Sequence, residues 1–335
     1  MTRGPTIACL LAVAVWLGAA GLLQAQQSAG GINLATPTLG GKQFWADELF
    51  FHQWRIQRNV FTGHCRLLDE DNVRHAWGTF YQCKARLGRI KQGRELPPMQ
   101  GKVVIVLHGL FRTRAAMSGI CKHLEEHGDY TVLNVGYPST QRDVGSHARA
   151  LGRIIENLDG VEEINFVAHS MGNIVIRHYL ADRAKWKTPA KENRRNSPPI
   201  KRFVMLAPPN HGSLAAVALS QNDAFKAVAG RAGQELGAEW AKLEGKLATP
   251  ECQFGIVAGG KGDEHGFNPL LPGDDDGTVT VKSTRLDGAR DFVVVPMLHT
   301  FMIDQVKVHE HTLRFLQHGH FVSEEKRQPV KGKDE

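Results

Sequence analysis

The stretch from residue 164 to residue 180 constrains the fold more than any other part of this sequence. Residues 164–167 read Ile-Asn-Phe-Val and predict a largely apolar strand, residues 168–172 read Ala-His-Ser-Met-Gly, and residues 173–180 predict a helix. Strand and helix pack closely at such a turn, so small residues are needed two positions before and two after the serine. We interpret the turn as a nucleophile elbow that holds Ser170 above a sheet edge. The alternative is a serine in an ordinary tight turn of a Rossmann-like unit.

The same alternation of strand and helix extends over the chain from residue 101 onward. A continuous apolar run, typical of a strand buried on both faces of a parallel sheet, occurs at residues 103–107, and mainly apolar segments predict further strands at residues 130–135, 203–206, 252–258 and 292–298. Helical patterns cover residues 113–128, 145–158 and 306–316. We therefore predict an α/β fold with a doubly wound, mostly parallel sheet. Such sheets carry their sites at the carboxyl ends of the strands, where Ser170 would lie.

Two later motifs supply chemical partners for Ser170. Residues 273–278 read Gly-Asp-Asp-Asp-Gly-Thr and offer three acids. We favour Asp276, because an aspartate before glycine in a sharp turn can reach a histidine and fix its tautomer. The alternatives for the run are solvated turn carboxylates or a Ca²⁺ site. His299 stands just beyond the last strand and is the predicted general base.

The motif His108-Gly109-Leu110 follows the first strong strand. Acyl transfer develops negative charge on a carbonyl oxygen, which backbone N–H groups in such a loop can stabilise. We predict the N–H groups of Leu110 and Met171 as the two donors. His108 itself is expected to brace the loop rather than to titrate. His211 is rejected as the base because it precedes the acidic run.

Residues 101–316 resemble the bacterial lipase and esterase branch of the α/β-hydrolase superfamily. The matching motifs are His108-Gly109-Leu110, Tyr137-Pro138-Ser139-Thr140, Ala168-His169-Ser170-Met171-Gly172, Pro208-Pro209-Asn210-His211-Gly212-Ser213 and Asp276-Gly277-Thr278-Val279. The resemblance implies a catalytic triad of Ser170, Asp276 and His299, an acyl-enzyme intermediate, and small-molecule or lipid esters as substrates. It implies no cofactor and no metal. An acyltransferase on the same fold is the alternative, and an inactive binding protein is a less favoured one.

The N-terminus predicts export. Arg3 precedes an apolar run at residues 7–23, and polar residues follow Ala25, which is the order of a signal peptide cleaved near Ala25. An uncleaved membrane anchor is the alternative. We expect a periplasmic or extracellular location, which is an oxidising compartment. The remaining cysteines are then expected to form two disulfides or to stay as buried free thiols; they are Cys65, Cys83, Cys121 and Cys252.

The formal net charge of +7 is spread along the chain and is densest at residues 185–195. No module of interleaved basic and aromatic residues occurs, so nucleic acid is not an expected partner. Contact with a lipid surface or another anionic surface is the partner that the charge allows.

The predicted organisation has four parts: a signal peptide (residues 1–25), a linker and N-terminal extension (26–100), the α/β-hydrolase domain (101–320) and a charged tail (321–335). Residues 214–250 are expected to form a helical cap or lid, or else plain surface helices. Within the extension, the aromatic-rich residues 44–54 predict a short helix. Residues 54–68 and 73–87 predict a hairpin around the acidic turn at residue 70.

Overall fold

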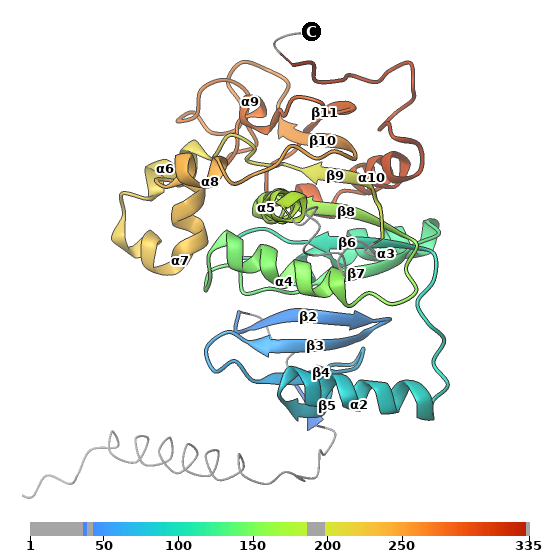
Figure 1. The fold of residues 1–335 in the computed structure, drawn as a ribbon. Coiled ribbons are helices and arrows are strands. Elements are labelled where there is room, and N and C mark those ends of the chain that lie inside the picture. The colour runs from blue at the N-terminus through green and yellow to red at the C-terminus, as the bar shows by residue number, and fades with distance from the viewer. Residues whose placement is uncertain (1–35, 39–42, 186–197, 333–335) are drawn as a thin grey trace, which may run out of the picture.

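The computed structural model describes residues 36–38, 43–185 and 198–332. The predicted signal peptide and most of the basic stretch at residues 185–195 lie outside the described residues. The described chain forms two stacked parts, a large α/β part and a smaller N-terminal layer (Figure 1).

The larger part is built on a six-stranded parallel sheet in the order β11-β10-β9-β8-β6-β7. Its strands are β6 (Lys102–Leu107), β7 (Thr131–Val135), β8 (Glu163–His169), β9 (Ile200–Leu206), β10 (Gln253–Gly260) and β11 (Asp291–Pro296). Most of their side chains are buried, which explains why the apolar runs show no alternation. The predicted doubly wound α/β sheet is confirmed.

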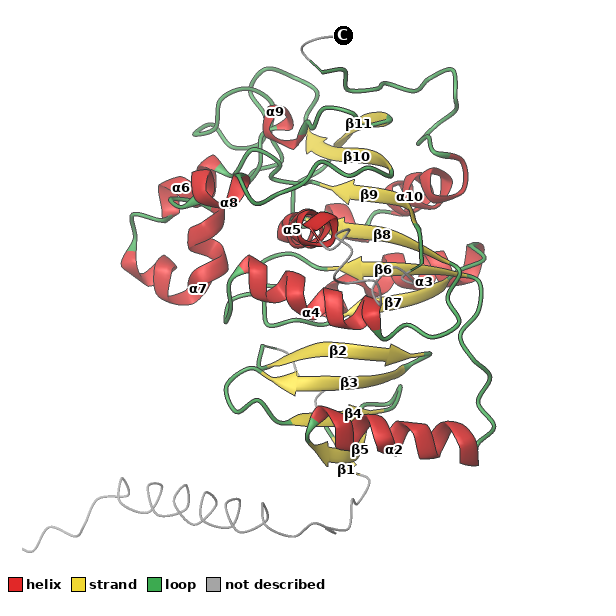
Figure 2. Ribbon diagram, in the orientation of Figure 1, coloured by secondary structure: helices red, strands yellow, loops and turns green. Residues whose placement is uncertain are grey.

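Helices cover both faces of this sheet (Figure 2). The first face packs against α4 (Val144–Glu156) and α5 (Met171–Lys185), and the second against the 3₁₀ helix η1 (Arg114–Met117), α3 (Ser118–His127) and α10 (Val306–His318). The chain leaves β6 toward the second face and leaves β8 toward the first. The carboxyl ends of these neighbouring strands therefore form a topological switch point, where α/β sheets place their sites.

Three helices form an insertion between β9 and β10. They are α6 (Leu214–Leu219), α7 (Asp223–Leu236) and α8 (Trp240–Glu244). In Figure 1 the arrows of β6, β9 and β10 point toward the side on which these helices lie. The backbone N–H of Val144 donates to the Glu235 carboxylate at 2.8 Å, which joins α7 to the start of α4. The predicted insertion is therefore present at the carboxyl ends of the strands, and its movement as a lid stays a prediction.

The N-terminal layer is an antiparallel sheet in the order β1-β5-β4-β3-β2. Its strands are β1 (Thr36–Pro37), β2 (Trp45–Phe51), β3 (Trp54–Asn59), β4 (Cys65–Leu68) and β5 (Val73–Gly78). The helix predicted for residues 44–54 is wrong, because these residues form β2 and the start of β3. Aromatic residues favour strands when neighbouring strands pair with them, and β2 pairs with β3 along its length.

The predicted hairpin is correct only around its turn, because residues 54–68 form two paired strands, β3 and β4, instead of one. β4 pairs with β5, but the chain then enters α2 (Phe80–Gly93) instead of continuing as a strand. Thr79 and Gln82 form a capping box at the start of α2, a signal that the sequence analysis did not use. α2 packs against β4 and β5, and α4 packs against β2, so the layer shares one apolar core with the first face of the parallel sheet.

The described cysteines are free thiols, the second of the two alternatives from the sequence. Cys65, Cys83 and Cys121 are buried, and Cys252 is partly buried. Burial raises the pKa of the Cys65 thiol to about 11 and that of the Cys83 thiol to about 12. These thiols therefore behave as small apolar side chains of the core.

The charged tail is held against the start of β11. The Asp291 carboxylate accepts the N–H groups of Phe321, at 2.7 Å, and Gln328, at 2.8 Å. Phe321 and Val330 are buried. In the described part of the chain, no helix combines the length and the apolar character that crossing a membrane requires.

Candidate active site

Ser170 lies between the last residue of β8 and the first residue of α5, with a left-handed φ of 54°. Such a conformation is unfavourable for a residue with a side chain and persists only where the surroundings enforce it. The Ser170 N–H donates to the carbonyl oxygen of Leu206 at 2.9 Å, and the Asn173 amide donates to the carbonyl oxygen of Ser170 at 2.9 Å. The turn is therefore fixed from both sides.

The small residue after the elbow is required by a close approach of backbone. A Cβ placed on Gly172 would lie 2.8 Å from the carbonyl oxygen of His108 and 2.9 Å from that of Leu107. Both atoms belong to the end of β6 and its loop, so they cannot move aside as a flexible side chain could. Ala168, the small residue before the elbow, is fully buried. This agrees with the packing reason given for the motif.

The structure brings Ser170, His299 and Asp276 together in one hydrogen-bonded row. Nε2 of His299 lies 2.9 Å from the Ser170 Oγ, and Nδ1 of His299 lies 2.7 Å from an Asp276 carboxylate oxygen. Because a carboxylate only accepts, Nδ1 carries the proton and Nε2 is left to accept from the hydroxyl. This tautomer is the one that can take a proton from Ser170.

Asp276 is positioned by its own turn. Its Oδ1 accepts the N–H groups of Thr278, at 3.0 Å, and Val279, at 2.7 Å, so Oδ2 is directed to the histidine. The His299 N–H also donates to the carbonyl oxygen of Asp276 at 2.8 Å. The side chain of Asp276 is completely buried, whereas that of His299 is 11% exposed. The acid is thus shielded from water and the base faces the surface.

His169 contacts both the backbone and the ring of His299. Its Nε2 donates to the carbonyl oxygen of His299 at 3.0 Å, and the two rings lie 4.7 Å apart. Burial, together with the neighbouring His299, holds the pKa of His169 well below its usual range. A neutral His169 adds no positive charge beside the base. No role for His169 was predicted from the sequence.

The predicted oxyanion loop, residues 108–112, lies directly against the elbow. A Cβ on Gly109 would come within 2.9 Å of the Ser170 Cβ, so only glycine allows this approach without a shift. Leu110 follows in the same turn, which the N–H of Arg112 closes onto the carbonyl oxygen of Gly109 at 3.3 Å. Met171 begins α5, where first-turn N–H groups have no acceptor within the helix. Both predicted donors therefore lie next to Ser170.

His108 braces this loop. It is buried, its Nδ1 lies 2.9 Å from the carbonyl oxygen of Gly109, and its ring stacks on Tyr137 at 4.2 Å. The Tyr137 hydroxyl donates to the His108 carbonyl oxygen. Burial lowers the pKa of His108 to about 4 and that of the neighbouring His147 to about 3.

The lowered pKa values of His108 and His147 predict that acid destabilises the protein. In the unfolded chain both bind protons near pH 6.5, but in the folded chain only near pH 4 and pH 3. The unfolded chain holds more protons in this interval, so the free energy of unfolding falls as the pH decreases from about 6.5. The unfolding temperature, measured between pH 7 and pH 4, should decrease less in a His147→Gln variant than in the wild type. Parallel curves would contradict the assignment.

The other two acids of the run have structural partners. The Asp274 carboxylate accepts the N–H groups of Lys261, at 2.7 Å, and Gly262, at 2.9 Å. Asp275 accepts the N–H of Gly277 at 2.6 Å. Both therefore shape the loop that presents Asp276. Within residues 36–38, 43–185 and 198–332, no cluster of three or more acidic, histidine or cysteine side chains is arranged to hold a metal ion.

His211, which was rejected as the general base, contacts a residue outside the site. Nδ1 of His211 lies 3.3 Å from the Glu244 carboxylate on α8, and both side chains are about half exposed. This contact is a surface feature of the insertion. It does not extend the row formed by Ser170, His299 and Asp276.

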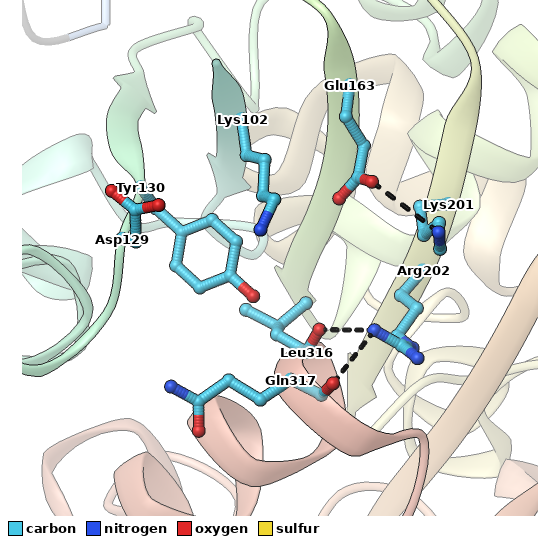
Figure 3. A pocket seen from close by; sticks show the side chains of 8 residues that line it. All are labelled: Lys102, Asp129, Tyr130, Glu163, Lys201, Arg202, Leu316 and Gln317. Atoms are coloured by element: carbon cyan, nitrogen blue, oxygen red, sulfur yellow. Dashed lines mark hydrogen bonds and ion pairs between the residues drawn. The ribbon is translucent and has the colours of Figure 1, made fainter.

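A polar pocket of about 360 Å³ lies at the opposite edge of the sheet (Figure 3). Lys102 and Glu163 begin β6 and β8, whereas Ser170 follows the carboxyl end of β8. Lys201 lies 3.7 Å from Glu163, and Arg202 donates to the carbonyl oxygen of Leu316 at 2.7 Å. These charges join β8, β9 and the end of α10. The pocket is separate from the row around Ser170.

No family model matches the sequence, and no curated protein matches it. Solved structures do share similarity with it. A lipase of Bacillus licheniformis in mature form is 16% identical over 66% of this chain and 94% of its own, with a TM-score of 0.41. A lipase of Staphylococcus hyicus is 11% identical over 62% and 90%, with a TM-score of 0.41. The phospholipase PlaB of Legionella pneumophila is 21% identical over 55% and 45%, with a TM-score of 0.40.

The parallel sheet, the strained serine at a strand-to-helix turn and the loop after β6 are the parts of an α/β-hydrolase fold. The fold predicted from the motifs is the fold observed.

Proposed function

We propose that the protein is a serine hydrolase of carboxylic esters, of the lipase and esterase type. The observation that carries the proposal is the row from Ser170 through His299 to Asp276, with contacts of 2.9 Å and 2.7 Å, at an elbow that touches Gly109. A nucleophile, a base within hydrogen-bond reach and a group that orients the base are the requirements for covalent acyl transfer.

The proposed reaction has two steps. His299 Nε2 takes the proton of the Ser170 hydroxyl while Oγ forms a bond to the ester carbonyl carbon, and the carbonyl electron pair moves to oxygen. The N–H groups of Leu110 and Met171 bind this oxyanion. When the tetrahedral intermediate collapses, the bond to the alcohol breaks and His299 returns its proton to the leaving oxygen. Water then attacks the acyl-enzyme in the same manner and releases the acid.

Exposed apolar side chains next to the oxyanion loop and His299 favour a substrate with an apolar acyl group. Phe111 in the oxyanion loop is 47% exposed, and Leu298 and Phe301 on either side of His299 are 38% and 53% exposed. Leu214 at the start of α6 is also exposed. Apolar side chains grouped around a site suit lipid esters and contact with a lipid surface. With the predicted signal peptide, we propose an exported enzyme that acts in the periplasm or outside the cell.

The test is the hydrolysis of p-nitrophenyl esters with acyl chains from short to long, together with labelling by an activated alkyl phosphonate. We expect turnover, and mass spectrometry should locate one phosphonate on the peptide that contains Ser170. Products formed in the presence of a lipid or sugar alcohol separate hydrolysis from acyl transfer to that alcohol. A protein with neither turnover nor label would be an inactive scaffold, contrary to the proposal.

A further inference from the structure

The N-terminal layer reaches the oxyanion loop through Gln43, which lies just before β2. The side-chain amide nitrogen of Gln43 donates to the carbonyl oxygen of Arg112 at 3.0 Å. Because a carbonyl oxygen only accepts, the nitrogen and not the oxygen of the amide must face it. The amide oxygen then faces Thr140, whose hydroxyl donates to it at 3.5 Å. Gln43 thus bridges the loop after β6 and the loop after β7.

Asp47, in β2, makes the second connection from the N-terminal layer. Its backbone N–H donates to the carbonyl oxygen of Gly136 at 2.9 Å, and its carboxylate accepts the N–H of Gly136 at 2.6 Å. The other carboxylate oxygen accepts from the Gln57 amide at 2.7 Å. Gly136 is the first residue after β7, so this pairing fixes the direction in which the chain leaves that strand. Asp47 is 1% exposed, and the contact is closed to water.

The contact at Gly136 continues to the first residue of the oxyanion loop. Tyr137 follows Gly136, donates its hydroxyl to the His108 carbonyl oxygen and stacks on the His108 ring with the planes only 9° apart. The oxyanion loop is therefore held at both ends by contacts that start from residues in β2 or just before it. Its start at His108 is held through Tyr137 and Asp47, and its end at Arg112 is held by Gln43.

The oxyanion loop contains a strained residue that its neighbours must hold in place. Phe111 has a left-handed φ of 61°, which is unfavourable for a non-glycine residue and must be enforced by the surroundings. Leu110 directly precedes it and carries the proposed oxyanion donor. An N–H acts as such a donor only at about 2.7–3.1 Å from the developing oxyanion. A small displacement of the loop therefore weakens the donor.

We propose that Gln43 and Asp47 are positioning residues that hold the Leu110 N–H at the oxyanion. The inference rests on the proposed function, because it assigns the N-terminal layer a role in the same acyl transfer. The layer then supports catalysis without contacting the substrate, because it holds the loop that carries the Leu110 N–H.

The test compares Gln43→Met with the wild type in ester hydrolysis. Methionine keeps the length of the side chain and lacks the amide donor. We expect kcat to fall by about 10-fold to 100-fold with little change in KM, since the lost alignment acts in the transition state. The inhibition constant of an alkyl boronic acid, whose tetrahedral adduct places an oxygen where the oxyanion forms, should rise by a similar factor.

The matched control is Gln92→Met, an exposed glutamine near the end of α2 in the same layer. It should leave kcat, KM and boronate inhibition unchanged, and both variants should keep the wild-type unfolding temperature. Asp47→Asn is the second variant; its amide offers one acceptor oxygen to two donors, the Gly136 N–H and the Gln57 amide nitrogen, so it weakens the contact and should reproduce the effect on kcat and boronate inhibition.

The outcomes separate this inference from the proposed function. Wild-type kcat and boronate affinity in Gln43→Met, beside an active wild type, would overturn the positioning role and leave the hydrolase intact. A wild type without turnover and without phosphonate on Ser170 would overturn both. A loss of kcat with unchanged boronate affinity would also refute the role, because the defect would then lie outside the oxyanion site.

Discussion

Replacing Ser170 with alanine is expected to lower kcat for ester hydrolysis by about 10⁶-fold, the loss typical of a serine nucleophile. Alanine leaves His299 with no hydroxyl at 2.9 Å to deprotonate, so the acyl-enzyme cannot form. The oxyanion donors remain, and their residual effect is about 10³–10⁴-fold over water. Initial rates with a p-nitrophenyl ester, measured at high enzyme concentration, give the ratio of kcat values.

Ser118→Ala is the matched control for this experiment. Ser118 is exposed at the first residue of α3, on the face of the sheet away from α5. The control should keep the wild-type kcat and the phosphonate label, whereas Ser170→Ala should lose both. Wild-type turnover in Ser170→Ala would remove the nucleophile assignment and with it the proposed mechanism.

Replacing Asp276 with asparagine is expected to lower kcat by about 10⁴-fold. Asparagine can keep its amide oxygen on the N–H groups of Thr278 and Val279, at 3.0 Å and 2.7 Å, so the turn survives. Its amide nitrogen then faces Nδ1 of His299 where a carboxylate oxygen stood. Two donors cannot pair, so His299 adopts the tautomer with the proton on Nε2. That nitrogen can no longer accept the proton of Ser170.

Asp274→Asn separates the two roles of the acidic run. Asp274 accepts the backbone N–H groups of Lys261 and Gly262, and its loss affects the loop rather than the tautomer of His299. Its kcat should stay far above that of Asp276→Asn, while its unfolding temperature falls. Equal losses of kcat in the two variants would mean that the loop as a whole, and not the Asp276 carboxylate, supports the base.

The parallel sheet was predictable because each of its strands carries its signal locally. A strand buried on both faces must be apolar throughout, so runs such as residues 103–107 identify β6 without reference to any partner. The elbow was predictable for the same reason, since β8, Ser170 and α5 are consecutive in the chain. Helix starts are also local, and Thr79 with Gln82 would have placed α2.

The N-terminal layer was not predictable in the same way. Residues 44–54 are rich in aromatic side chains, which suit either a short helix or a strand. The choice depends on pairing with neighbouring strands, and β2 gains its partner only when β3 turns back on it. The aspartate and glutamate at positions 47 and 48 stand in this apolar stretch and are buried in the structure. An acidic pair inside an apolar stretch is a sequence feature that indicates specific polar contacts, because buried acids need partners. The prediction for this segment did not take it into account.

The sequence by itself determined the parallel sheet, the serine at its elbow, the histidine after the last strand and a choice of three acids in which Asp276 was favoured. Only the tertiary structure decided that Asp276 faces His299 while Asp274 and Asp275 fold their own loop. It also decided that Gln43 meets Arg112, a residue 69 positions further along the chain. The physical reason is that strand burial and turn chemistry act between neighbours in sequence. The direction of one side chain toward a distant loop depends on how separate elements pack.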